Sequence, residues 1–233
     1  MNVVKLLMLI VVAVVATPAR AAIIVNGSFE DPTVPVGAFI NFLGGSTAIT
    51  GWTVVGVDSS VVNGTFTQNG IVFQAQSGNQ WIDLAGINSN STTSGVTQNV
   101  ATAPGATYQL SFYVGSSTDN NFFFASTVDL SINGGPRASF TNPVTPTNQL
   151  DWRQFTASFT ATSATTNITF FNGSAPSNFQ SGLDNVSLSE VSVVPEPASM
   201  VILGVGSILS FAGVRRRREH ACPAAEPGAA AEG

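Results

Sequence analysis

The chain has 233 residues, carries a net charge of −5 at pH 7 and is 44% hydrophobic but only 9% charged, so its length allows one ordinary domain together with targeting segments. Residues 22–193 contain two arginines, nine acidic residues and no lysine, histidine, cysteine or methionine. This composition excludes a Ser-His-Asp triad, a cysteine nucleophile, an ordinary zinc site and a nucleic-acid-binding surface from that part of the chain.

The N-terminus has the pattern of a secretory signal peptide. A lysine at position 5 precedes the apolar run LLMLIVVAVVA, and Ala19 and Ala21 fit the A-x-A pattern that precedes a cut. The alternative is a retained membrane anchor, which needs about 20 apolar residues, and this run is shorter. We therefore expect residues 1–21 to be a signal peptide that is removed on export.

The middle of the chain has the alternating pattern of β-strands. Apolar and polar residues alternate in five segments, at 107–115, 126–134, 155–162, 167–171 and 183–191. This period of two, with many Val, Thr, Phe and Ile, is typical of half-buried strands. Clusters of Gly, Asn, Ser and Pro between the segments indicate turns. We therefore predict an all-β fold over residues 22–193, a single β-sandwich of the jelly-roll kind.

The three tryptophans of this region are candidate platforms for sugar rings, because sugars stack on aromatic planes. We expect Trp52 and Trp152 to be structural, since each directly precedes a predicted strand. Trp81 lies in NQWIDLAG, beside two amide side chains and the carboxylate of Asp83. Trp81 and Asp83 are therefore candidate ligand-binding residues, with cross-strand hydrogen bonding as the alternative.

Glycoside hydrolysis would need two carboxylates across a cleft. No local motif singles out such a pair among the nine acidic residues, and we expect no enzymatic activity.

The C-terminal region has the layout of a weak membrane anchor. Residues 198–214 carry no charge and would form about 25 Å of helix, which is short for a bilayer core of about 30 Å. The arginines that follow would lie in the cytoplasm by the positive-inside rule, and residues 219–233 would be a disordered cytoplasmic tail. These arginines are Arg215, Arg216, Arg217 and Arg218.

The order VPEP, apolar span and arginine cluster resembles the PEP-CTERM sorting signal and covers residues 194–218. The resemblance implies that an exosortase, a membrane-embedded sorting protease, recognises Val194, Pro195, Glu196 and Pro197. It also implies a precursor anchored in the inner membrane and a mature protein at the cell surface or in the extracellular matrix of a Gram-negative bacterium. The sequence departs from the usual pattern in the tail EHACPAAEPGAAAEG after the arginines.

A second resemblance covers nearly all of residues 22–193. Its motifs are IVNGSFEDP (24–32), TAITGWTVVG (47–56), NQWIDLAG (79–86), GVTQNVATAPGATYQLSFYVG (95–115) and SGLDNVSLSEV (181–191). In this order they resemble choice-of-anchor surface domains, which are related to galactose-binding-like jelly rolls and carbohydrate-binding modules. The resemblance implies a structural calcium ion held by Glu30 in the first motif and Asp184 in the last. The alternative is that both are turn or cap residues bonded to the backbone.

Together these features predict a non-catalytic surface or matrix protein that is sorted by an exosortase and associates with extracellular polysaccharide, as in a biofilm matrix. Its expected partners are the membrane, the exosortase and the polysaccharide, with no nucleic acid, and calcium is the one expected cofactor. Two alternatives stay open: a structural or adhesive matrix protein without a sugar site, and a carboxylate-dependent enzyme that acts on glycans.

Overall fold

The computed structural model describes residues 24–87, 90–117, 125–143, 149–174 and 180–191. Within these ranges the chain forms thirteen β-strands and no helix. The strands are β1 (Phe39–Leu43), β2 (Thr53–Val55), β3 (Asp58–Asn63), β4 (Thr67–Gln68), β5 (Ile71–Val72), β6 (Gln80–Asp83), β7 (Gly95–Ala101), β8 (Thr107–Ser116), β9 (Ser126–Ile132), β10 (Ala138–Asn142), β11 (Asp151–Thr160), β12 (Thr165–Asn172) and β13 (Gly182–Glu190). The predicted signal peptide, sorting motif, membrane span and tail lie outside the described residues.

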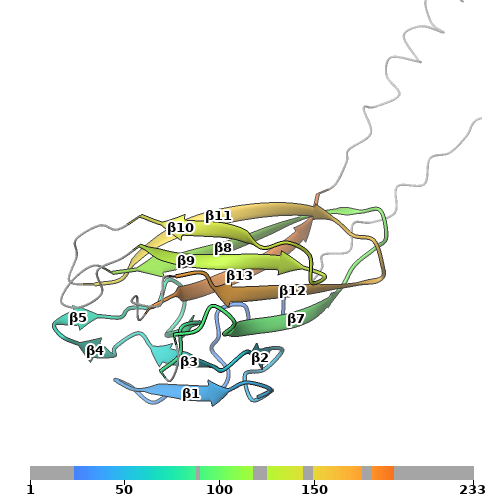
Figure 1. Cartoon of the computed structure of the whole chain (residues 1–233). Helices are drawn as coiled ribbons and strands as arrows, with labels where there is room; N and C mark the ends of the chain where they lie inside the picture. Colours follow the sequence, from blue (N-terminus) through green and yellow to red (C-terminus); the bar gives the residue numbers. More distant parts are fainter. Residues whose placement is uncertain (1–23, 88–89, 118–124, 144–148, 175–179, 192–233) are drawn as a thin grey trace, which may run out of the picture. The chain divides into compact units, whose positions relative to one another are not determined.

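The strands form two antiparallel sheets that pack on a shared core, so the predicted β-sandwich is confirmed. The larger sheet has six strands in the order β1-β3-β6-β13-β8-β11, and the second has five in the order β10-β9-β12-β7-β2. The short strands β4 and β5 pair with each other at one end of the domain (Figure 1).

The alternation seen in the sequence decides which face of each strand is buried. In β8, the side chains of Tyr108, Leu110, Phe112 and Val114 are at most 1% exposed, and polar residues between them face outward. The five predicted segments correspond to β8, β9, β11, β12 and β13. The largest difference is in β11, which begins at Asp151 because its first four residues continue the ladder with β8.

Aromatic rings fill the core between the sheets. The ring of Phe112 lies 5.0 Å from that of Phe170 and 5.1 Å from that of Phe140, centroid to centroid. Trp52 is 1% exposed, and its indole donates to the carbonyl oxygen of Asn26 at 3.1 Å. Trp52 is therefore structural, as predicted. Fully burying one such side chain contributes about 1.5–3 kcal/mol.

A second, smaller core covers the outer face of the six-stranded sheet. The chain between β3 and β6, which includes β4 and β5, folds over this face. Its buried apolar side chains are those of Val62, Ile71, Phe73, Trp81 and Leu150. The segment between β3 and β6 therefore rises above part of the outer sheet face and bounds it on one side.

The first motif of the domain packs against the last strand. The amide of Val186 in β13 donates to the carbonyl oxygen of Gly27 at 2.8 Å. Nearby, the ladder between β13 and β8 is irregular between Asp184 and Ser187. The two motifs that open and close the domain thus lie side by side, which places Glu30 and Asp184 in one region.

Candidate functional site

A pocket of about 330 Å³ opens on the outer face of the six-stranded sheet, next to the smaller core. Its floor comes from β3 and β6, where Ser60 pairs with Asp83 and Val62 pairs with Trp81. Because side chains alternate along a strand, these four residues point to the same face. The sequence segment that suggested a ligand site therefore lies on the floor of a real pocket.

Aromatic rings line much of this pocket. Phe39 of β1, Phe66, Phe73 and Trp81 all contribute to its lining. Neighbouring centroids are 5.4 Å apart between Phe39 and Phe66, 5.6 Å between Phe66 and Phe73, and 6.3 Å between Phe73 and Trp81. Phe39 is 38% exposed, so the row of rings runs from the buried floor to the mouth of the pocket.

Trp81 is both a core residue and a pocket wall. It is 1% exposed, and its indole N–H donates to the carbonyl oxygen of Phe73 at 2.8 Å. Its ring also meets that of Trp152 edge-on at 5.8 Å. The packing fixes the Trp81 ring rigidly, and its donor group is already used within the protein.

Gln180 also lines the pocket, and its side chain is unusual. The residue is 1% exposed, and neither its amide oxygen nor its amide nitrogen has a hydrogen-bond partner among the described residues. Burying an unpaired amide costs about 1–3 kcal/mol. A bound molecule with hydroxyl or amide groups would satisfy both atoms, which marks Gln180 as a polar contact for a ligand.

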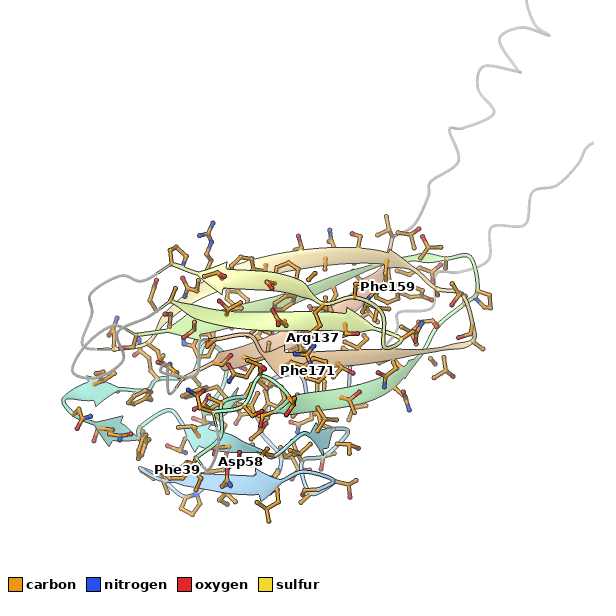
Figure 2. All side chains as sticks on the ribbon, in the orientation of Figure 1. Phe39, Asp58, Arg137, Phe159 and Phe171 are labelled. Atoms are coloured by element: carbon orange, nitrogen blue, oxygen red, sulfur yellow. The ribbon has the colours of Figure 1, made fainter. Side chains whose placement is uncertain are left out.

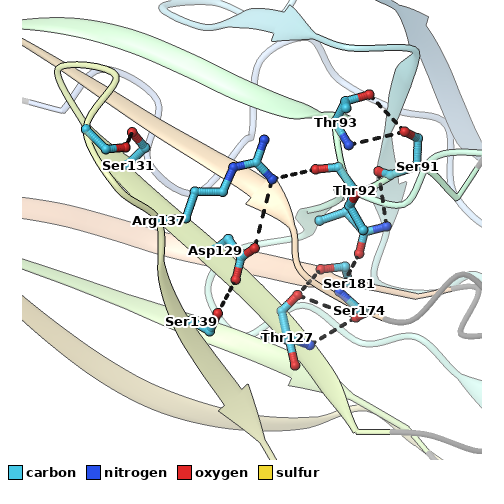
Figure 3. Close-up of polar contacts among 12 residues, drawn as sticks. Ser91, Thr92, Thr93, Thr127, Asp129, Ser131, Arg137, Ser139, Ser174 and Ser181 are labelled. Atoms are coloured by element: carbon cyan, nitrogen blue, oxygen red, sulfur yellow. Dashed lines mark hydrogen bonds and ion pairs between the residues drawn. The ribbon is translucent and has the colours of Figure 1, made fainter.

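The backbone around Gln180 is held in place by hydroxyl groups. The carbonyl oxygen of Gln180 accepts bonds from the hydroxyls of Ser126 at 3.1 Å and Ser174 at 3.2 Å. The hydroxyl of Ser181 donates to the carbonyl oxygen of Thr127 at 2.9 Å, within the cluster drawn in Figure 3. These bonds preorganise the position from which the Gln180 side chain enters the pocket.

Asp83 supplies the carboxylate on the pocket wall. Its Oδ1 accepts the amide N–H groups of Ser181 at 2.9 Å and Ala85 at 3.0 Å. Burial raises the pKa of Asp83 to about 7, and the nearby carboxylate of Asp58 adds to the increase, while the two amide bonds oppose it. Asp83 therefore links the floor of the pocket to the segment that carries Gln180.

Glu30 and Asp184 meet at a second place, on the two sides of the loop between β5 and β6. Oε1 of Glu30 accepts the N–H groups of Asn79 at 2.7 Å and Gln80 at 2.9 Å. Oδ2 of Asp184 accepts the N–H groups of residues 76 and 77 at 2.9 and 3.0 Å. One loop thus donates to both carboxylates.

Asp184 is fully buried, and its environment disfavours charge. Burial raises the pKa of Asp184 to about 7, with the negative charge of Glu30 adding to the increase and three backbone amides opposing it. Glu30 also lines a hollow of about 450 Å³. Two carboxylates near each other suit a hard cation, although the described residues hold no group of three or more acidic, histidine or cysteine side chains.

Comparison with protein families identifies the main domain. Residues 22–189 match the family described as "Protein of unknown function (DUF642)". The chain is a DUF642 protein. Residues 193–218 of this DUF642 protein match the PEP-CTERM protein-sorting motif. The predicted sorting signal is thereby confirmed, and it identifies an exported protein that an exosortase sorts to the cell surface. Among the described residues no helix is long and apolar enough to cross a membrane, and the predicted span at 198–214 lies outside them.

Three solved structures are similar to the DUF642 protein at low sequence identity. An exo-β-1,3-galactanase from Phanerochaete chrysosporium, solved with β-1,3-galactotriose, is 20% identical with a TM-score of 0.40 over 67% of this chain and 30% of that one. The family 35 carbohydrate-binding module from Clostridium thermocellum is 19% identical, with a TM-score of 0.39 over 70% and 96% of the two chains. The GH26-CBM35 β-(1,4)-mannanase of Podospora anserina is 13% identical, with a TM-score of 0.39 over 69% and 29%.

The chain spans less than a third of the two enzymes named here. No curated protein matches the chain.

The structure brings together the predicted pair Trp81 and Asp83, and separately the predicted pair Glu30 and Asp184. Sequence reasoning missed Gln180, Phe39 and Phe66. Each of these three is far from Trp81 in the sequence and reaches the pocket only through strand order and the fold of the β4–β5 segment. The side-chain amide of Gln80 is used within the protein, because it donates to the carbonyl oxygens of residues 29 and 32.

Proposed function

We propose that this DUF642 protein is a non-catalytic surface protein that binds extracellular polysaccharide through the pocket beside Trp81. The single observation that supports this best is the buried amide of Gln180, which lines an aromatic pocket and has no hydrogen-bond partner among the described residues. Aromatic rings accept the C–H faces of sugars, while amides and carboxylates bind their hydroxyl groups. The pocket contains each of these groups on one preorganised floor.

The pocket chemistry favours binding over catalysis. Of the described residues that line it, one carries a carboxylate, Asp83. Hydrolysis of a glycosidic bond needs a second carboxylate across the scissile bond. The carboxylate of Asp83 and the amide of Gln180 are instead the polar contacts expected of a recognition site.

The sorting signal suggests where this binding takes place. The precursor would be anchored in the inner membrane of a Gram-negative bacterium, with the β-sandwich on the outer side. Exosortase processing at Val194–Pro197 would then release or reattach the domain at the surface or in the matrix, where polysaccharide is abundant.

A glycan-binding experiment with the full chain in a sugar-free detergent tests the proposal. We expect saturable binding to at least one polysaccharide of the producing cell, and a loss of affinity of at least tenfold in Gln180→Leu. The same variant should unfold at an equal or higher temperature, because it removes two buried unpaired polar atoms.

The matched control is Gln109→Leu, which makes the same exchange on the exposed face of β8 and should bind normally. Absence of binding to every polymer would refute the sugar site and leave the structural or adhesive role.

We also propose that Glu30 and Asp184 hold a structural calcium ion. A cation beside both carboxylates would offset their mutual repulsion and lower the pKa of Asp184. The expected result is a higher unfolding temperature of the full chain in calcium than in chelator, and a loss of that difference in Glu30→Gln. Equal unfolding temperatures in the two conditions would support the alternative, in which backbone amides alone satisfy both side chains.

A further inference from the structure

The pocket beside Trp81 is lined by one carboxyl group, that of Asp83, and by no basic side chain among the described residues. The two arginines of residues 22–193 are used elsewhere. The guanidinium of Arg137 lies 3.6 Å from the ring centroid of Phe171 and 3.9 Å from Oδ2 of Asp129, on the five-stranded sheet (Figures 2 and 3). Arg153 lies over the ring of Phe155 at 5.4 Å. Neither side chain lines the pocket.

The carboxylate of Asp83 has one oxygen that the protein leaves for another partner. Both amide bonds to Asp83 end on Oδ1, and no described residue donates to Oδ2. The carboxylate of Asp58 lies close enough to repel it, and Asp58 is itself fully buried. Among the described residues that line the pocket no basic side chain accompanies Asp83, so a bound cation would stabilise its ionised form.

The aromatic rings add to the preference for a cation. Phe39, Phe66 and Trp81 line the same pocket as Asp83. The face of an aromatic ring attracts an ammonium group within about 6 Å of its centroid. Ring faces together with a carboxylate form a chemical environment that recognises a protonated amine, and Gln180 supplies a donor and an acceptor for neighbouring hydroxyls.

We propose that the pocket selects an amino sugar, a hexosamine unit whose amine is free and protonated. The ammonium group lies at Oδ2 of Asp83, the sugar ring lies on the aromatic wall, and a hydroxyl contacts Gln180. This inference rests on the proposed sugar-binding function. N-acetylation removes the positive charge, and a uronic acid would place a second carboxylate beside Asp83, so both should bind more weakly.

Four hexasaccharides of comparable length test this selectivity against the full chain in a sugar-free detergent. They are a β-1,4-linked glucosamine oligomer, its fully N-acetylated form, the neutral glucose oligomer and an oligogalacturonate. We expect the glucosamine oligomer to bind at least tenfold more tightly than each of the others at a pH of about 6.5 and low salt. We expect added salt to weaken this binding more than that of the neutral oligomer.

Two variants assign the effect to the pocket. Asp83→Asn keeps an oxygen for the two backbone amides but removes the charge, so it should reduce the glucosamine preference to less than twofold. Glu190→Gln removes one negative charge at the end of β13, away from the pocket residues, and should keep the preference. The unfolding temperature of each variant shows whether it is folded.

The outcomes separate this inference from the proposed function. Equal binding of the glucosamine and neutral oligomers, lost together in Gln180→Leu, would overturn the amine selectivity and leave sugar binding in place. Tightest binding of the oligogalacturonate would also overturn it. Binding of no glycan, here or among the polysaccharides of the producing cell, would overturn both.

Discussion

At the scale of single residues, the domain depends on a few close backbone contacts that only glycine allows. A Cβ atom at Gly27 would lie 2.0 Å from the carbonyl oxygen of Val186, far inside the van der Waals limit. This is the point where the first motif docks on β13. Because Gly27 has no side chain, the first motif can pack closely against β13. This packing keeps Glu30 next to Asp184.

Gly27→Ala should consequently destabilise the protein by at least about 2 kcal/mol, because the clash is with backbone that cannot move aside. Gly37→Ala is the control. Gly37 has a positive φ of 73°, but a Cβ atom added there would have no neighbour within 4 Å. Backbone strain alone should therefore destabilise this variant by about 1 kcal/mol. Chemical denaturation of both variants measures the difference. Equal losses would show that the contact at Val186 yields easily.

Some residues of the two candidate sites could be predicted from the sequence, and others could not. Trp81 and Asp83 were predictable because they are neighbours in a short strand that contains amides and an aromatic ring. Gln180 was not predictable, because its special property is the lack of a partner, which depends on everything around it. Glu30 and Asp184 were paired through a family resemblance, and no local pattern links residues so far apart in the chain.

At the scale of elements, one loop connects the two carboxylates of the opening and closing motifs. The loop between β5 and β6 donates two amides to Asp184 and one to Glu30, and Gln80 at the start of β6 donates a second amide to Glu30. Gly78 lies within it with a φ of 69°, and a Cβ there would meet Oε1 of Glu30 at 2.3 Å. The loop can wrap around both acids because glycine permits this conformation.

The ionisation of Asp184 should make stability depend on pH. Its pKa is raised from 3.8 to about 7 in the folded protein, so the folded state keeps this proton in a range where the unfolded state has lost it. The contribution of Asp184 to stability is greatest below a pH of about 4, falls as the pH rises, and levels off above about 7. Between a pH of about 5 and 8 we expect Asp184 alone to account for a loss of roughly 2–3 kcal/mol in chelator.

Chemical denaturation across this range measures the slope. Asp184→Asn should remove about half of it, because Asp83 has a similarly raised pKa and contributes the rest. Calcium should also reduce the slope if the ion binds at Asp184, since it favours the ionised form. A wild-type stability that rises between these pH values would contradict the buried environment described for Asp184.

The elements themselves were largely predictable. Strands β8, β9, β12 and β13 follow the alternation of the sequence, because one face of each strand packs in the core. The short strands β4 and β5 and the smaller core were not predicted. Two-residue strands have no period to detect, and the cover over the outer sheet face follows from how a loop folds back rather than from its composition.

At the scale of the whole molecule, the targeting segments and the β-sandwich have separate tasks. The main domain has no lysine and only two arginines, whereas four of the eight basic residues of the chain follow the predicted span. The distribution of basic residues therefore distinguishes the main domain from the predicted targeting segments. The match of residues 193–218 to the sorting motif agrees with that division.

Replacing Pro195 and Pro197 together by alanine should block processing. Proline restricts its own backbone and that of the preceding residue, so the motif offers a protease an extended segment. In a host that makes an exosortase, we expect the variant precursor to accumulate in the membrane fraction at its full mass. Pro223→Ala in the tail is the control and should be processed normally. Release of the double variant at the normal rate would show that the motif is not the recognised element.

Strand β13 lies in the middle of the six-stranded sheet, between β6 and β8, although it comes last in sequence among the described strands. Export delivers the polypeptide from its N-terminus, so the sheet stays split in two until this strand arrives. A chain broken off during synthesis lacks both the strand that joins the halves and the sorting signal a few residues beyond it. The last strand needed for the fold and the signal needed for sorting thus lie next to each other in the sequence. A truncated product would lack both, and we expect it to be degraded instead of reaching the surface.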